Sequence, residues 1–153
     1  MTESTEGDRL LELVRHFAAT TSQCRMGASE AGGTEPGAYV LLFRLPAALP
    51  FARGGLKHMF VPGWYAYAGS AYGPGGLGGR IRRHLRPAKT AHWHVDSLTN
   101  AADEIRFIAV PDGNECELGR AIVQSGIFRS ALAGFGSSDC RSCESHLFQA
   151  RSA

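Results

Sequence analysis

Two short apolar runs, each bounded by proline or glycine, limit the folds open to this chain. Gly37–Leu45 (GAYVLLFRL) is aliphatic and β-branched and lies between Pro36 and Pro46, while residues 63–71 (GWYAYAGSA) are small and aromatic. Runs of this length and composition, with turn residues at both ends, predict β-strands. A third run, residues 105–110 (IRFIAV), stops at Pro-Asp-Gly and predicts another strand. The chain is therefore expected to build a sheet.

A helical pattern follows the second of these runs. The glycine-rich turn at residues 73–79 (GPGGLGG) leads into RIRRHLRP, where Leu77, Ile81 and Leu85 recur every fourth residue up to Pro87. This spacing predicts an amphipathic helix that the proline ends. Arginines crowd the rest of its surface.

Three other segments have helical signals. Asp8–Ala19 carries apolar residues at helical spacing, and residues 92–102 (HWHVDSLTNAA) can open a helix. Asn114 is a suitable N-cap for ECELGRAIVQSG, and Gly126 is expected to end that helix. The sequence thus alternates between strand and helix signals, as a mixed fold does.

Length and composition indicate one domain. The chain has 153 residues, of which 44% are hydrophobic, and this size suits a single core. Residues 1–36 are expected to form a short helix and a flexible linker (Thr20–Pro36), residues 37–150 the folded domain, and residues 46–62, rich in proline and glycine, a long connection with short extended pieces. The chain has no run of about 18–20 uncharged apolar residues and an acidic start, which predicts a cytoplasmic protein that does not contact membranes.

The charges are unevenly distributed. The net charge is only +2, yet residues 36–95 contain no acidic residue. The basic residues of this segment are Arg44, Arg53, Lys57, Arg80, Arg82, Arg83, Arg86 and Lys89. The remainder of the chain is acidic, and a local excess of positive charge predicts a polyanionic partner.

The glycine-rich turn allows two interpretations. Gly73, Gly75 and Gly78 match the G-x-G-x-x-G pattern of dinucleotide-binding folds. The helix that follows is crowded with arginine, and no GK[ST] sequence follows the turn, so a turn that permits close backbone approach is the favoured interpretation. A nucleotide-binding enzyme is the third and weakest functional hypothesis.

Two clusters have metal-ligating residue types. His92, His94 and Asp96 would share one face if HWHVD were extended, and phosphate binding or a structural role is favoured there over zinc. Cys140, Cys143 and His146 form C-x-x-C-x-x-H, which lacks a fourth zinc ligand unless Cys116 folds nearby. Partly buried, reduced thiols are the favoured interpretation.

A further set of residues could serve phosphodiester hydrolysis. Tyrosines cluster around the first two strands, Arg80 and His84 form a row beside the apolar stripe of the basic helix, and Glu115 and Glu117 begin a later helix. Together they supply a proton acceptor for water, a cation for the charge on phosphorus and a carboxylate for a divalent metal.

The order of these residues resembles the GIY-YIG nuclease superfamily. Its hallmark is G-I-Y on one strand and Y-I-G on the next, followed by an arginine and a glutamate on helices; here residues 37–39 read GAY and residues 67–69 read YAG. The longer strings YAYAGSAYGPGGLGGRIRRHLR, HWHVD, ECEL and GFGSSDC…SHLF resemble its stand-alone Uri-type branch, formerly a domain of unknown function. The resemblance covers about residues 37–148.

The resemblance implies an α/β (α+β) fold with a small three-stranded antiparallel sheet flanked by helices. It implies that Tyr39 and Tyr67 line the site, one of them as a general base, that Arg80 contacts the scissile phosphate, and that His84 occupies a position that is His or Tyr in related nucleases. Glu117, with Glu115 as the alternative, would bind Mg²⁺ or Mn²⁺, since magnesium is often held by one carboxylate plus waters and phosphate.

The leading expectation is therefore a metal-dependent endonuclease that hydrolyses DNA, single-stranded or branched DNA included, in repair, processing or uptake. It would act as a monomer or a homodimer. The alternative is a catalytically inactive nucleic-acid-binding module of the same fold. In either case the expected nucleic-acid contacts are Arg82, Arg83, Arg86, Lys89, His92 and His94.

Overall fold

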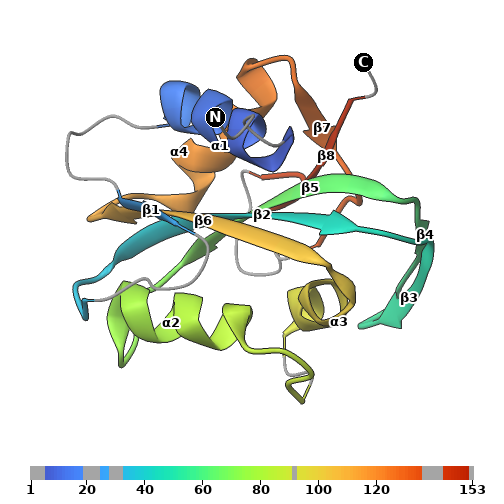
Figure 1. Cartoon of the computed structure of the whole chain (residues 1–153), viewed down its shortest axis with the longest axis horizontal. Coiled ribbons are helices and arrows are strands. Elements are labelled where there is room, and N and C mark those ends of the chain that lie inside the picture. Colours follow the sequence, from blue (N-terminus) through green and yellow to red (C-terminus); the bar gives the residue numbers. More distant parts are fainter. Residues whose placement is uncertain (1–5, 19–24, 28–32, 91–92, 136–142, 152–153) are drawn as a thin grey trace, which may run out of the picture.

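Helices cover both faces of one antiparallel sheet. The computed structural model describes residues 6–18, 25–27, 33–90, 93–135 and 143–151. The main sheet has six strands in the order β1-β6-β2-β5-β8-β7 and forms the middle layer in Figure 1. Its strands are β1 (Arg25–Gly27), β2 (Gly37–Leu45), β5 (Gly63–Ser70), β6 (Glu104–Pro111), β7 (Phe128–Ser130) and β8 (Leu147–Ala150). None of the helices in these described ranges is long and apolar enough to cross a membrane.

The three strands expected from the apolar runs are confirmed as the centre of the sheet. β2 lies between β6 and β5 and pairs antiparallel with both. The expectation of a three-stranded sheet is wrong, because β1 adds to the outer edge of β6 while β8 and β7 extend the sheet beyond β5. β1 and β7 have only three residues each, so they carry no alternating pattern of their own and depend on the neighbouring strand for their hydrogen bonds.

Alternation along the central strands divides the apolar side chains between two layers. Helices α2 (Gly76–Leu85) and α3 (His94–Ala101) lie on one side of the sheet, and α1 (Glu6–Ala18) and α4 (Glu115–Gln124) lie on the other (Figure 1). The first side buries Tyr39, Leu41, Phe43, Tyr65, Leu77, Ile81 and Phe107. The second side buries Val40, Leu42, Trp64, Ile108, Leu118 and Ile122. Each face of the sheet is therefore apolar, as a sheet between two helical layers requires.

The connection between β2 and β5 is more regular than a loop with extended pieces. It forms a hairpin of β3 (Leu49–Arg53) and β4 (Leu56–Phe60), seen at the right of Figure 1. Gly54 and Gly55 form its turn with φ of 59° and 83°, values that suit glycine. Phe51 and Phe60 pack against Phe135 and join the hairpin to the core.

The described part of the N-terminal segment packs against the sheet. Leu11 and Val14 of α1 are buried in the second core layer, and Arg106 of β6 forms an ion pair with Asp8 of α1. β1, which lies within the expected linker, pairs with β6. Residues 6–18 and 25–27 therefore contribute to the same core as the strands that follow, and the domain boundary expected at residue 37 stays a prediction.

Helix α2 begins against the backbone of residues 33–35. The Leu77 amide donates to the Glu35 carbonyl at 2.9 Å, and the Gly78 amide donates to the Gly33 carbonyl at 2.9 Å. Gly76 has φ of 61°, and a Cβ there would overlap the Thr34 carbonyl. The turn therefore provides close backbone approach, and two of the amides that a phosphate would need at this helix start are already used.

We expect Gly76→Ala to lower the free energy of unfolding by more than about 2 kcal/mol, because it adds both a strained φ and a collision with backbone atoms. Gly79→Ala is the matched control in the same helix, since a Cβ at Gly79 would meet nothing within 4 Å. It should raise stability by about 0.5–1 kcal/mol. Urea unfolding of both variants measures the difference, and equal effects would contradict the assigned role of Gly76.

Candidate functional site

A tyrosine and a histidine meet where α2 packs on the central strand. Tyr39 of β2 and His84 of α2 are 2% and 0% exposed, and the Tyr39 hydroxyl is hydrogen-bonded to His84 Nε2 at 2.7 Å. His84 lies seven residues after Leu77, on the buried face of α2. The contact is therefore fixed by the core positions of both elements.

Arg80 and Tyr67 complete this group, which we call the tyrosine cluster (Tyr39, Tyr67, Arg80 and His84). The Arg80 guanidinium lies 4.6 Å from the centre of the Trp93 ring, and it is close enough to Tyr39 to lower the pKa of that hydroxyl. The Tyr67 ring centre is 6.4 Å from that of Tyr39 and 6.3 Å from that of His84. Four of the five predicted catalytic residues thus converge at one place.

Glycine at position 69 makes room for this arrangement. Gly69 is directly opposite Tyr39 in the register of β2 and β5. A Cβ at Gly69 would lie 2.5 Å from the Tyr39 hydroxyl oxygen, which is closer than packed atoms approach. The glycine of the Tyr67-Ala68-Gly69 triplet therefore permits the position of the Tyr39 ring.

Burial favours the neutral forms of Tyr39, Tyr67 and His84. Burial raises the pKa of Tyr39 well above its usual value, assisted by Tyr67 and opposed by Arg80. Burial lowers the pKa of His84 to about 3, and only Asp96 acts in the opposite direction while Lys89, Arg83 and Arg80 lower it further. His84 Nδ1 is buried and has no hydrogen-bond partner among the described residues.

The charge of Glu115, in the first turn of α4, acts on Tyr67. Burial raises the pKa of Tyr67 to about 12, and the negative charges of Asp96 and Glu115 add to the effect. Glu115 is half-buried, whereas Glu117 is exposed. Both glutamates follow Asn114, which is confirmed as the N-cap because its Oδ1 accepts hydrogen bonds from the amides of Cys116 and Glu117. The partial burial of Glu115 and the effect of its charge on Tyr67 therefore favour Glu115, the alternative, over Glu117 as the carboxylate that acts on the tyrosines.

The predicted nucleic-acid contacts divide into exposed and internally engaged residues. Arg82 and Arg86 are exposed on and just after α2. Arg83 forms two hydrogen bonds of 2.9 Å with Asp96, and its guanidinium lies 4.1 Å from the centre of the Trp93 ring. Lys89 is 8% exposed and donates to the carbonyls of His84 and Arg86 at the end of α2 and to Asn100 Oδ1.

Residues 94–96 of the His-x-His-x-Asp segment are helical rather than extended. α3 begins at His94, and Asp96 lies in its first turn, so the face that the extended form would give is not present. The fully buried Asp96 instead accepts from the Trp93 amide at 2.8 Å and binds Arg83. His94 packs against Phe51 and Phe135, and His92 lies outside the described residues.

Sequence reasoning missed Trp93 as a functional residue. Its ring contacts the guanidiniums of Arg80 and Arg83 and lies 5.5 Å from the His84 ring centre. Cation–π contact of this kind orients an arginine that is still partly exposed. Trp93 is visible within HWHVD, but its separation from α2 along the sequence does not predict that its ring contacts arginines of that helix.

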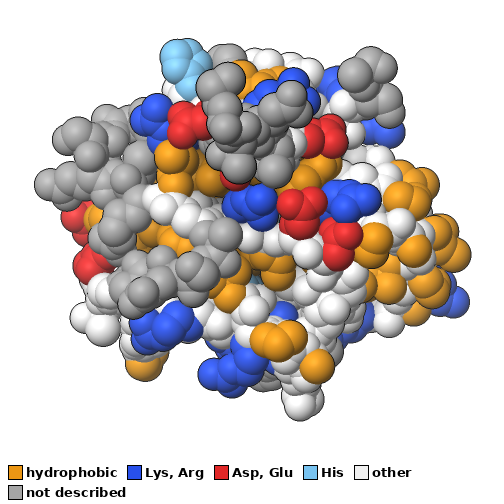
Figure 2. Space-filling model, in the orientation of Figure 1, with side chains coloured by type: hydrophobic (Ala, Val, Ile, Leu, Met, Phe, Trp, Pro, Cys, Tyr) orange, Lys and Arg blue, Asp and Glu red, His pale blue; other side chains and the backbone are white. Residues whose placement is uncertain are grey.

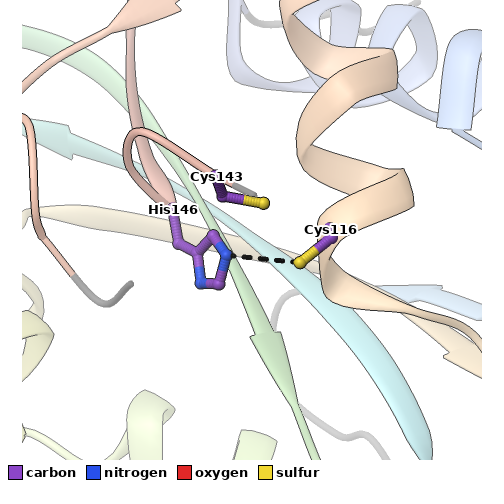
Figure 3. Close-up of side chains that lie close together, drawn as sticks. All are labelled: Cys116, Cys143 and His146. Carbon is purple, nitrogen blue, oxygen red and sulfur yellow. Dashed lines mark hydrogen bonds between the residues drawn. The ribbon is translucent and has the colours of Figure 1, made fainter. Parts of the chain in front are cut away.

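Three metal-ligating side chains also come together beside α4. Cys116, Cys143 and His146 have ligand atoms that all lie within 4.8 Å of one another, and Cys116 Sγ is 3.8 Å from His146 Nε2. Figure 3 shows Cys116 on the helix facing the other two on the segment before β8. Cys116 therefore lies close to Cys143 and His146 of the C-x-x-C-x-x-H motif, which was the condition for Cys116 to act as a further ligand. Cys140 lies outside the described residues.

The chain belongs to the family described as Domain of unknown function DUF123, which matches residues 38–153. The match includes β2, β5, α2 and α4, and therefore every residue of the tyrosine cluster and the three-ligand group. No curated protein and no solved structure matches the chain.

Because His84 is buried in its neutral form, we expect the free energy of unfolding to fall as the pH is lowered. Its pKa is about 3 in the folded protein against 6.5 unfolded, so the unfolded chain binds more protons between these values. Stability is thus full above pH 6.5 and falls by up to about 1.4 kcal/mol per pH unit as the pH drops toward 3. Urea unfolding followed by tryptophan fluorescence at several pH values measures this slope.

His84→Gln is the control for this pH dependence. It keeps a polar partner for Tyr39 but removes the titrating ring, so its stability should decline less steeply over the same pH range. Carboxylates titrate alike in both proteins and cancel in the comparison. Identical slopes would contradict a neutral, buried His84.

Arg83 and Arg82 should differ in their effects on folding. Arg83→Gln leaves the Asp96 carboxylate, which is 0% exposed, without its cation, so we expect a loss of about 2–4 kcal/mol in the free energy of unfolding. Arg82→Gln changes an exposed side chain and should alter stability by less than about 0.5 kcal/mol. Chemical denaturation compares the neighbours, and a stable Arg83→Gln protein would show that the ion pair is dispensable.

Proposed function

We propose that this protein is a metal-dependent endonuclease that hydrolyses phosphodiester bonds of DNA, as its resemblance to the GIY-YIG superfamily implies. The observation that supports the proposal best is the convergence of Tyr39, Tyr67, Arg80 and His84 from β2, β5 and α2. These side chains are distant in sequence and carry the chemical groups that phosphodiester hydrolysis requires.

Arg80 is the proposed phosphate ligand. Its partly exposed guanidinium lies against Trp93 and reaches Tyr39, so it can contact a substrate while its position is held by the core. A planar guanidinium binds phosphate oxygens through two parallel hydrogen bonds and stabilises the charge that develops on them. Arg83, which is bound to Asp96, supports the same tryptophan from the next turn.

Tyr39 and His84 provide a route for the proton of water. As the water oxygen bonds to phosphorus and the bond to the leaving oxygen breaks, Tyr39 accepts the water proton and passes its own hydroxyl proton to His84 Nε2. The leaving oxygen takes a proton from solvent. The 2.7 Å contact permits this transfer. A bound phosphate adds negative charge, which favours the protonated imidazole that burial disfavours.

Glu115 is the proposed protein ligand for Mg²⁺ or Mn²⁺. It is half-buried and its charge acts on Tyr67, so the carboxylate is within electrostatic reach of the cluster. Magnesium commonly takes one or two carboxylates and completes its coordination with water and substrate phosphate, which fits one glutamate. When bound, such an ion supplies charge stabilisation and lowers the pKa of coordinated water.

The exposed arginines of α2 extend the proposed DNA surface. Arg82 and Arg86 lie beyond Arg80 on and just after this helix, and Figure 2 shows Lys and Arg side chains along the lower edge of the molecule, where α2 lies in Figure 1. Cations in this position favour a phosphate backbone without reading bases. Because Arg83 and Lys89 have internal partners, we propose a smaller set of phosphate contacts than the sequence indicates.

A catalytically inactive nucleic-acid-binding module is the second candidate. The raised pKa of Tyr39 and the lowered pKa of His84 favour it, because a protonated phenol and a weakly basic imidazole are poor proton acceptors before substrate binds. This candidate predicts salt-sensitive binding without metal-dependent cleavage.

Cleavage assays on the purified full chain test the proposal. Single-stranded, duplex and branched DNA, and the matching RNAs, are incubated with Mg²⁺, Mn²⁺ or chelator. We expect metal-dependent cleavage that Tyr39→Phe, Arg80→Ala and Glu115→Gln each reduce by about 10²-fold or more, as loss of a group that stabilises the transition state does. Glu117→Gln should reduce it less than Glu115→Gln, and the reverse order would assign the metal to Glu117.

Arg120→Ala is the matched control for Arg80→Ala. Arg120 is exposed on α4, so its removal should leave cleavage within about threefold of the unaltered protein while changing the net charge equally. Cleavage that survives in all variants would reject the assignment and indicate a contaminating nuclease. Binding without cleavage by the unaltered protein would favour the inactive module.

A further inference from the structure

A sulfur and nitrogen site lies beside α4, separate from the tyrosine cluster. Cys116 is the second residue of α4, while Cys143 and His146 belong to the segment that leads into β8. Their ligand atoms lie within 4.8 Å of one another, and Figure 3 shows the two sulfurs and the imidazole turned toward a common point. Within the described ranges this is the only such group of three.

The spacing suits a tetrahedral metal. With bonds of about 2.3 Å to sulfur and about 2.0–2.1 Å to nitrogen, tetrahedral geometry separates the ligand atoms by about 3.5–3.8 Å. The Cys116 Sγ to His146 Nε2 distance is already 3.8 Å. The remaining ligand distances, at most 4.8 Å, require side-chain movement of about one ångström.

The ligand types select the metal. Two thiolates and an imidazole are soft or borderline donors that favour Zn²⁺, whereas Mg²⁺ and Mn²⁺ favour oxygen. Two thiolates also balance the charge of Zn²⁺, and the start of a helix stabilises thiolate at Cys116. The chemistry therefore separates this group from the carboxylate proposed for magnesium.

Hydrogen bonds hold the backbone at two of the three ligands, Cys116 and His146. His146 donates its amide to the Phe135 carbonyl at 2.9 Å, and its carbonyl accepts from the Ala68 amide at 2.9 Å. The His146 side chain is 5% exposed. Asn114 caps the turn that carries Cys116. These two ligands therefore need little ordering when a metal binds, and Cys143 lines a cleft together with Gly119, Val123 and Phe148.

We propose that Cys116, Cys143 and His146 bind one Zn²⁺ ion that joins the first turn of α4 to the strand segment beside β5. The ion takes no part in the chemistry of the proposed hydrolysis, because its ligands do not belong to the tyrosine cluster. Its consequence for that cluster is positional, since Glu115 precedes Cys116 directly.

The first test is metal content. The full chain is purified under reducing conditions after growth with zinc, and bound metals are measured by mass spectrometry against protein concentration. We expect about one zinc per chain. The double variant Cys116→Ser/Cys143→Ser and the single variant His146→Gln should each retain less than a tenth, since loss even of groups that only support a metal ligand weakens binding by about 10–100-fold.

His58→Gln is the control for the histidine change. His58 lies exposed on β4, in the hairpin rather than near α4, so zinc content should not change. Undiminished zinc in the cysteine double variant would overturn the proposal. So would unaltered protein that binds no zinc, or a Cys116–Cys143 disulfide found by mass spectrometry in protein kept reduced.

Cobalt replacement provides a test that does not depend on the variants folding. Unaltered protein loaded with Co²⁺ should show thiolate-to-cobalt charge transfer in the near ultraviolet and the strong visible bands of tetrahedral cobalt. A cobalt spectrum without thiolate absorption would overturn the proposal. Cleavage assays have no part in either readout, so failure of the zinc site and failure of the nuclease proposal are separate results.

Discussion

The hydrogen bond between Tyr39 and His84 joins the central strand to the helix that carries the arginines. Both side chains are almost completely buried, so the contact is made in an apolar layer where an unpaired hydroxyl would be costly. Burial also keeps His84 neutral. Arg80 lies one turn before His84 on α2, and its position relative to β2 and Trp93 therefore follows from the same packing. If this contact were lost, the arginine would no longer be held over Trp93 with its charge acting on Tyr39.

Part of the positive charge of residues 36–95 is taken up by partners within the folded protein. Arg44 forms ion pairs with Asp103 and Glu104, Arg83 binds Asp96, and Lys89 donates to carbonyls at the end of α2. These partners come from the acidic remainder of the chain or from the backbone. Exposed cations such as Arg82 and Arg86 remain accessible to a polyanionic partner. A charge run along a sequence therefore overstates the charge that a surface presents, because helix ends and buried carboxylates take part of it.

Sequence patterns predicted those helices and strands whose formation depends on residues nearby in the sequence. The three central strands, the arginine helix and the Asn114 N-cap each depend on nearby residues, and all are confirmed. β1 and β7 could not be predicted, since strands of three residues exist only through their partners. The helix expected to open in HWHVDSLTNAA is confirmed as α3, because Asp96 accepts from the Trp93 amide at its start. The choice between Glu115 and Glu117 depends on the rotation of α4 about its axis, which packing of Leu118 and Ile122 sets.

The first turn of α4 carries two neighbouring residues with different metal preferences. Glu115 offers oxygen and its charge acts on Tyr67, whereas Cys116 offers sulfur and faces His146. Successive helical residues point about 100° apart, so one turn can serve a hard and a soft cation without sharing a ligand. With zinc bound to Cys116, the turn would be tied to the segment paired with β5, the strand that carries Tyr67. The carboxylate and the tyrosine would then be held by one connected framework, and the geometry of the proposed hydrolytic site would depend on a metal that takes no part in the proposed reaction.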